Sequence, residues 1–460
     1  MTAAATRAVG PAPAGQLADA PAPTGRFADD AAAFGAYWQS AEASLAQLPA
    51  KPKRNAAEAR AAAAILDAAR DARVAFLEAH AETLYRRLTG ELSRYVRLEE
   101  LIFDAAALVP GLVPSRAALA REAALKQADK DGIELDQGLF VARLMRHEAL
   151  AQHLCHAMML PLPESRERLA AFQRTGAADL GKATVERSGA VSTVTIRNPE
   201  ALNAEDATTM TPLEIAVDLA LLDPATKICV LRGGPVPHAK YGGRRAFGAG
   251  INLTHLYWGK VPYLFYLVRD LGMLNKIYRG ITRPQDPPDE TLGLGTEKLW
   301  IAAVESFAIG GHCQLLLVMD YVLAAEDAYM TLPARKEGII PGMANMRLPR
   351  FVGDRLTRQA IMYEKRIDCA SPEGRMICDE IVPAGTMDAA IERVAHGLTN
   401  SGVVNAAANR RAFRIIDEPL SAMIRYLSVY AREQAYCHTS PALVANLERY
   451  WNAHQRQVKA

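Results

Sequence analysis

The stretch from Trp300 to Ala325 constrains the fold of this chain more than any other. Its first residues, Trp300 to Val304, form an apolar run of strand length, and Leu315 to Met319 form a second run typical of a buried helix. Gly310 and Gly311 lie between the two runs and predict a turn. Because glycine carries no Cβ, a strand-to-helix turn of this kind lets the backbone approach a ligand, with helix N–H groups directed at it. The stretch therefore predicts an α/β fold with a turn that can hold an oxyanion.

A second turn of small residues lies upstream, at Ala246 to Leu256 (AFGAGINLTHL), and it also leads into a helical pattern. Backbone N–H groups from two separate turns can donate to one carbonyl oxygen, and both bonds strengthen as that oxygen becomes negative. The enolate chemistry of thioesters needs this arrangement.

The pairing of the two turns resembles the crotonase (enoyl-CoA hydratase) superfamily, since AFGAGINL is similar to its first oxyanion turn and SFAIGGHCQL to its second. The resemblance continues through Tyr329–Gly353 and Arg366–Ala395, in the family order, and covers residues 184–395. It implies an α/β crotonase core of stacked ββα units. It also identifies the N–H groups of Ile251 and Gly311 as the oxyanion donors.

Hydrophobic periodicity divides the chain into four regions. Residues 1–28, rich in Ala, Pro and Gly and lacking an apolar signal core, are predicted to be a disordered leader. Helical patterns fill residues 29–182 and predict an added all-helical domain, whereas alternation typical of strands begins near Thr184. The crotonase core is expected over residues 183–398, followed by a C-terminal helical region over residues 399–460.

The helical domain carries clear signals for one long helix. Asn55 and Glu58 predict a capping box at its start, and Gly90 predicts its end. Its apolar face consists of Ile65, Ala69, Ala72, Phe76, Leu84 and Leu88. Further helices are expected around residues 95–108, 116–129 and 139–160.

The C-terminal region predicts an amphipathic helix with an apolar stripe. The stripe consists of Leu420, Met423, Ile424, Leu427 and Tyr430. Terminal helices build the trimer in crotonases, so the resemblance implies trimerisation helices here and a homo-oligomer, either a trimer or a dimer of trimers. A monomer would leave the stripe exposed to water.

Composition argues against several classes of function. The 460 residues include 23% charged residues and carry a net charge of +2, which gives no case for nucleic acid or a membrane surface as partner. No apolar run is long enough to span a bilayer. Six scattered cysteines without a CxxC pair predict reduced thiols in a cytoplasmic protein. His147, Glu148, His153, Cys155 and His156 lack the HExxH spacing and are interpreted as core and surface residues.

The segment before the first oxyanion turn is a loop rich in basic residues (PVPHAKYGGRR), which follows a predicted strand at Lys227–Gly234. A solvated connection is the simplest interpretation. In the family, however, the coenzyme's phosphates lie here, where charges and hydrogen bonds can bind them. The resemblance implies contacts with coenzyme A from His238, Lys240, Tyr241, Ala249, Gly250, Asn252, Leu253 and Thr254.

The sequence departs from the family at the residues that handle water. Gln314 and Ala334 stand where hydratases have two glutamates, and neither can exchange a proton near neutral pH. Glu337 is displaced by three positions and is expected to face another direction. His312 replaces the usual third glycine and adds bulk beside Gly311. Hydratase activity is therefore disfavoured, although the oxyanion hole is retained.

An oxyanion hole without hydration carboxylates still stabilises a thioester enolate, which can be protonated, be acylated or react with dioxygen. The helical domain, the Gln314 and Ala334 pair, and Arg269 resemble the cofactor-independent arylacetyl-CoA dioxygenases of this superfamily. That resemblance implies that Arg269 and Glu205 recognise ring hydroxyl groups and that Gln314 lies against the acyl group. A solvent-facing Arg269 and a helix-start carboxylate at Glu205 are the alternatives.

The resemblance implies that an arylacetyl-CoA thioester and dioxygen are the substrates, with no metal or other cofactor. No cluster of His, Cys, Asp or Glu has metal-ligand spacing, and neither glycine-rich turn matches a dinucleotide fingerprint. Two other interpretations remain at this stage. One is an isomerase or thioesterase of the same superfamily that uses Glu205 or Glu337 as its base, and the other is a non-catalytic acyl-CoA-binding module.

Overall fold

The computed structural model describes residues 17–383, 385–400 and 402–458. Most of the predicted leader lies outside these residues. Within the part described, Phe27 begins the first helix and is buried, so this helix starts two residues before the predicted boundary. Gly25 and Thr24 donate backbone hydrogen bonds to the buried carboxylate of Asp30, which fixes the entry into this helix.

The N-terminal region is helical, as predicted. It contains α1 (Phe27–Ala46), α2 (Ala56–Leu88), α3 (Leu98–Leu108), α4 (Arg116–Ala123), α5 (Leu135–Leu144), α6 (Glu148–Met159) and α7 (Pro163–Thr175). The capping box of α2 is confirmed, because the Asn55 side chain accepts from the N–H of Glu58, and Glu58 accepts from that of Asn55. The single helix expected at 139–160 is wrong: a turn at residues 145–147 separates α5 from α6. Periodicity does not reveal so short an interruption.

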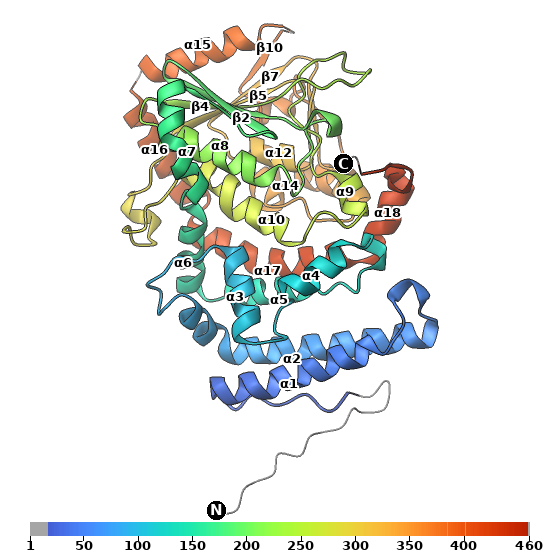
Figure 1. The fold of residues 1–460 in the computed structure, drawn as a ribbon. Helices are drawn as coiled ribbons and strands as arrows, with labels where there is room; N and C mark the ends of the chain where they lie inside the picture. Colours follow the sequence, from blue (N-terminus) through green and yellow to red (C-terminus); the bar gives the residue numbers. More distant parts are fainter. Residues whose placement is uncertain (1–16, 384, 401, 459–460) are drawn as a thin grey trace, which may run out of the picture.

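The second half of the chain contains a seven-stranded sheet in the order β1-β2-β3-β4-β5-β7-β10 (Figure 1). Its strands are β1 (Ala177–Asp179), β2 (Ala183–Ser188), β3 (Val191–Ile196), β4 (Ile228–Gly233), β5 (Leu299–Val304), β7 (Tyr321–Ala325) and β10 (Glu380–Val382). The strands from β3 to β10 run parallel, whereas β1, β2 and β3 form an antiparallel meander. Every residue of β4 and β5 is buried, which explains why their sequences are mainly apolar.

A three-stranded sheet holds the turn that follows β5. It contains β6 (Phe307–Ile309), β8 (Tyr329–Thr331) and β9 (Ile367–Asp368). The predicted Gly310-Gly311 turn comes directly after β6 and starts α12 (Gly311–Leu316). This helix includes only the first two residues of the apolar run Leu315 to Met319, because the chain turns after Leu316 to enter β7.

Helices pack around the two sheets in the upper part of Figure 1. They are α8 (Met210–Leu222), α9 (Leu253–Tyr257), α10 (Leu264–Arg269), α11 (Asn275–Arg279), α13 (Ala334–Glu337), α14 (Ala344–Tyr363), α15 (Met387–Asn400) and α16 (Val403–Asp417). A π-helical turn, η4 (Asp270–Leu274), connects α10 to α11 without a break in the chain direction. Such turns are frequent at functional sites.

The last long helix, α17 (Leu420–Thr439), lies among the N-terminal helices (Figure 1). It packs closely against α5, and α18 (Pro441–Trp451) follows it. The apolar stripe that we expected to be exposed is buried within the same chain, with Leu427 and Met423 fully covered. The reason given for oligomerisation is therefore wrong. Exposed apolar side chains lie instead on α16, where Val404, Phe413 and Ile416 are 85%, 68% and 80% exposed.

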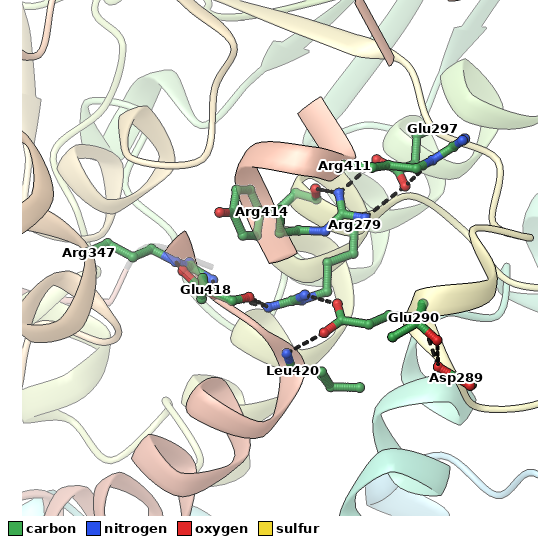
Figure 2. A network of polar contacts seen from close by, with 11 residues as sticks. Arg279, Asp289, Glu290, Glu297, Arg347, Arg411, Arg414, Glu418 and Leu420 are labelled. Atoms are coloured by element: carbon green, nitrogen blue, oxygen red, sulfur yellow. Dashed lines mark hydrogen bonds and ion pairs between the residues drawn. The ribbon is translucent and has the colours of Figure 1, made fainter. Parts of the chain in front are cut away.

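A buried network of arginines and glutamates connects α17 to the α/β core (Figure 2). Glu418, just before α17, accepts from Arg347 at 2.7 and 2.8 Å and from Arg350 at 2.8 Å. Its backbone carbonyl accepts from Arg279 at 2.7 Å. Arg279 also pairs with Glu290 at 2.5 Å. The network thus joins α11, α14 and the start of α17.

The structure adds two general observations. None of the helices in the described ranges combines the length and the apolar character that crossing a membrane requires. All six cysteines are free thiols.

Candidate active site

The two turns rich in small residues lie against each other. Gly248 pairs with Ala308 as an isolated parallel bridge, and the N–H of Ile309 donates to the carbonyl of Gly248 at 2.9 Å. Gly250 fits so closely that a Cβ there would lie 2.8 Å from the Ile309 carbonyl oxygen and 3.4 Å from the nitrogen of Gly311. Only glycine tolerates both this contact and the left-handed φ of 76°.

Each turn presents one backbone N–H that no acceptor among the described residues satisfies. Glu205 flanks Ile251, since its N–H donates to Gly250 at 2.7 Å and its carbonyl accepts from Asn252 at 2.8 Å. This pairing directs the N–H of Ile251 away from Glu205. Gly311 is the first residue of α12, where an N–H has no partner within the helix. Ile251 and Gly311 line the same cavity, so the structure brings the two predicted donor positions to one place.

His312 joins the two turns, a role that the sequence analysis did not identify. Its Nδ1 accepts from the N–H of Gly250 at 3.0 Å, and its ring crosses that of Phe247 edge to face. The ring fills the space above Gly248, where a Cβ would lie 2.1 Å from Nε2. Burial lowers the pKa of His312 to about 4, so the ring is neutral at pH 7 and Nδ1 can accept. This histidine therefore holds the first oxyanion turn against the second.

Arg269 lies inside the protein at the end of α10 and does not face solvent. Its Nε donates to both carboxylate oxygens of Glu205, at 2.9 and 3.0 Å. Nη1 donates to Asp270 at 3.2 Å and to Gln314 at 3.0 Å, and Nη2 donates to the carbonyl of Gly311 at 2.7 Å. These bonds use four of the five N–H groups of a guanidinium. Burial opposes the charge, but Glu205 and Asp270 outweigh it and raise the pKa of Arg269.

Arg269, Glu205 and Gln314, selected from sequence, thus meet at one place beside the second oxyanion turn. The alternative of a helix-start carboxylate at Glu205 is wrong, because α8 begins only at Met210 and the carboxylate pairs with Arg269. The cluster is so close to the backbone that a Cβ on Gly311 would lie 2.7 Å from Glu205 Oε2. Only glycine therefore fits at the second donor position.

These groups line one small cavity beside the two turns. Its polar side carries the cluster of Arg269, Glu205 and Gln314 and the two donor turns. The apolar part of its lining is formed by Phe265, Leu332, Ile339, Ile340, Pro341 and Tyr430. A planar aromatic acyl group with polar substituents matches this division of the wall.

The two positions that hold glutamate in hydratases both face the cavity, and so does Glu337. Gln314 and Ala334 both line the cavity, as their alignment with the hydratase carboxylates predicts. Glu337 was expected to face elsewhere, and this expectation is wrong. Residues 334–337 form a single turn of helix, α13, so residues three apart share a face and Glu337 also lines the cavity.

The residues predicted to contact coenzyme A lie in two groups. His238, Lys240 and Tyr241 form an exposed loop whose Tyr241 ring packs on Phe307 of β6, with 4.9 Å between the ring centroids. Ala249, Gly250, Asn252, Leu253 and Thr254 lie in the first oxyanion turn and the start of α9.

Asn252 has a structural task in addition to any ligand contact. Its side chain caps α9 by accepting from the N–H of His255 at 3.2 Å, and it donates to Asp206 at 2.9 Å. Its amide is therefore not free to turn towards a ligand.

The histidines of the helical region have local partners. His153 bonds to the Tyr85 hydroxyl at 2.8 Å, His156 to the carbonyl of Arg283 at 3.0 Å, and both rings stack on Tyr95. Across the described residues, no group of three or more His, Cys, Asp or Glu side chains is placed to hold a metal ion.

The chain is similar to one protein family and to several known proteins. The family model described as enoyl-CoA hydratase/isomerase matches residues 186–425. The chain is 45% identical to the (3,5-dihydroxyphenyl)acetyl-CoA 1,2-dioxygenase of Amycolatopsis orientalis over 84% of this chain and 88% of that protein. It is 30% identical to a probable enoyl-CoA hydratase of Rhizobium meliloti over 43% of this chain and 67% of that protein. A solved enoyl-CoA hydratase from Mycobacterium avium matches over 58% of this chain and 98% of its own chain. The identity is 22% and the TM-score is 0.48.

Proposed function

We propose, since this chain belongs to the enoyl-CoA hydratase/isomerase family, that it binds a coenzyme A thioester with the carbonyl oxygen between Ile251 and Gly311. The two N–H groups are fixed by backbone pairing and by His312, so they need no reorganisation when charge develops. Such a site lowers the barrier to removing a proton from the carbon next to the carbonyl.

The reaction that we propose is a dioxygenation without a metal or organic cofactor. Its substrate is (3,5-dihydroxyphenyl)acetyl-CoA, and its products are 3,5-dihydroxyphenylglyoxylate and free coenzyme A. One observation carries this proposal: the oxyanion donors are kept, while Gln314 and Ala334 occupy the positions of the hydration carboxylates. The identity to the Amycolatopsis dioxygenase along most of both chains supports the choice of substrate.

The proposed steps balance without a further reductant. Loss of one α proton gives an enolate, which passes electrons to dioxygen and forms a carbon–oxygen bond at the α carbon. The peroxide then attacks the thioester carbonyl and expels coenzyme A as the thiolate. Cleavage of the oxygen–oxygen bond, with loss of the second α hydrogen as a proton, leaves the α-keto acid.

In this proposal the polar cluster positions the aryl ring. Arg269 keeps one N–H free of the described partners, and Glu205 can accept from a hydroxyl, so the pair suits a ring with two phenolic groups. Gln314, held by Arg269, lies against the acyl group. The apolar wall excludes water from the enolate and offers space for dioxygen.

Coenzyme A would extend from the cavity along the first oxyanion turn. We assign its contacts to His238, Lys240 and Tyr241 in the exposed loop and to Ala249, Gly250, Asn252, Leu253 and Thr254 at the turn, with Asn252 contributing through its backbone. We also propose that the enzyme is cytoplasmic and belongs to the dihydroxyphenylglycine branch of glycopeptide antibiotic biosynthesis, to which it contributes the arylglyoxylate.

For assembly we propose a homo-oligomer, a trimer or a dimer of trimers. Phe413 and Ile416, which are three residues apart on α16, support it, since exposed apolar side chains on one helix face suit an interaction surface. Light scattering at micromolar concentration tests this, and a monomer would contradict it.

Isotope labelling tests the reaction. Enzyme stripped with chelator and shown to be metal-free should consume one dioxygen per thioester cleaved. With heavy dioxygen, one labelled atom should enter the new ketone and one the carboxylate. Label from water in the carboxylate, or unchanged turnover under nitrogen, would make the protein a thioesterase.

A further inference from the structure

Glu337 is a buried carboxyl group beside the second oxyanion turn. It ends α13, one helical turn after Ala334, and only 5% of it is exposed. Its Oε1 lies 3.7 Å from where a Cβ on Gly310 would be, and Gly310 immediately precedes the donor Gly311. Glu337 lines the same cavity as Gly310 and Gly311. The carboxyl group is thus displaced by one turn from the hydratase position but still reaches the cavity.

Neighbouring charges do not neutralise this carboxyl group. Arg335 and Lys336, on the same helical turn, pair with Glu364 at 2.9 and 2.5 Å. No salt bridge or hydrogen bond joins the carboxyl group of Glu337 to another side chain in the described ranges. Burial and the negative charge of Glu364 together raise the pKa of Glu337 to about 7.

The other titratable groups near Glu337 are poor proton acceptors. Burial raises the pKa values of Tyr266 on α10 and Cys313 on α12, and the charge of Glu337 raises both further. Both groups therefore stay protonated at pH 7. Across the cavity, both oxygens of Glu205 accept from Arg269. Glu205 is therefore held as the ion-pair partner of a buried arginine, whereas Glu337 has its lone pairs free.

We propose that Glu337 is the proton acceptor that forms the enolate, an inference that rests on the proposed function. Its carboxylate takes one proton from the α carbon, and the electron pair of that carbon–hydrogen bond enters the enolate, whose oxygen the Ile251 and Gly311 donors stabilise. The carboxylic acid so formed returns the proton to the coenzyme A thiolate when it departs. A base whose proton affinity is close to that of the medium is suited to both transfers.

The decisive experiment separates proton removal from oxygenation. Wild type and Glu337→Gln are incubated under nitrogen in heavy water with (3,5-dihydroxyphenyl)acetyl-CoA, and deuterium at the α carbon is followed by mass spectrometry. Oxygen uptake in air is measured in parallel. We expect the variant to lose exchange and oxygen uptake by about a hundredfold or more, the usual contribution of a general base. The exposed Glu373, which pairs with Lys365 at 3.0 Å, provides a matched control, and Glu373→Gln should exchange like wild type.

A second variant tests the assignment without touching the carboxyl group. Exchange by wild type should fall as the pH drops below about 7, because protonated Glu337 cannot accept. Glu364→Gln removes the nearest like charge and should move this midpoint to lower pH. If the midpoint of the pH profile does not move in Glu364→Gln, or if Glu337→Gln keeps the same midpoint, the titrating group is a residue other than Glu337.

The outcomes distinguish this inference from the proposed function. Oxygen uptake by Glu337→Gln at the wild-type rate would overturn Glu337 as proton acceptor and leave the dioxygenase intact. If wild type exchanges but takes up no oxygen, and Glu337→Gln does not exchange, the dioxygenase is overturned and Glu337 remains the base of another enolate reaction. If wild type shows neither exchange nor oxygen uptake, both proposals are overturned.

Discussion

The buried network around Glu418 predicts a large effect of one isosteric substitution. Glu418→Gln keeps the shape of the side chain but removes the charge that faces Arg347 (Figure 2). The same charge also faces Arg350. Burial raises the pKa of Glu418, but the arginines outweigh it and lower the pKa from 4.5 to about 2. That difference corresponds to about 3 kcal/mol of folding free energy. Breaking a buried pair from one side costs a similar amount, about 3–5 kcal/mol, because Arg347 stays buried without its partner.

The assay is urea unfolding followed by circular dichroism, for wild type, Glu418→Gln and a control. Asp354→Asn serves as control because its pair with Arg358 is exposed at both ends, and we expect it to change the stability by less than about 0.5 kcal/mol. The Glu418 contribution is complete above its unfolded pKa of about 4.5 and is lost as the pH falls towards 2. The difference between wild type and Glu418→Gln should therefore shrink over that window. A loss under about 1 kcal/mol at pH 7, or a difference independent of pH, would refute the reasoning.

Three further predictions concern the active site. Gly311→Pro removes one oxyanion donor and should lower kcat about a hundredfold or more, and full activity in a folded variant would remove Gly311 from the mechanism. His312→Phe leaves the N–H of Gly250 without its acceptor and should cost about 1–3 kcal/mol of stability, measurable as a shift of the urea midpoint that His312→Gln partly restores. Arg269→Lys keeps the charge but loses the planar fork, so activity should fall more for the dihydroxyphenylacetyl thioester than for a phenylacetyl thioester. An equal loss on both substrates would assign Arg269 to structure.

The order of strands and helices at the site could be predicted from the sequence because each element depends on local signals. The capping box at Asn55, the hairpin of β2 and β3, and the strand before Gly310 are all encoded within a few residues. Gly310 and Gly311 indicated a close backbone approach, and the structure shows the atoms that require it.

What the sequence could not supply depends on contacts between distant segments. The predicted orientation of Glu337 is wrong because LPARKEG is interpreted as a strand or turn from the sequence, whereas the structure forms one turn of helix there. The acceptor role of His312 requires Gly250, which is sixty-two residues earlier and is brought close only by the pairing of the two turns. The stripe on α17 was read correctly as apolar, but its partner α5 lies in a part of the chain that sequence periodicity treats as a separate domain.

The position of α17 has a consequence for how this molecule is made. This helix covers α5 and contributes Tyr430 to the wall of the cavity, yet it is synthesised well after the N-terminal helices. Those helices leave the ribosome with an apolar face that residues 420–439 help to cover in the folded protein. They therefore reach their final packing only after residues 420–439 have been synthesised. A ribosome that stalls before Leu420 would release a protein with neither a complete helical layer nor a closed cavity.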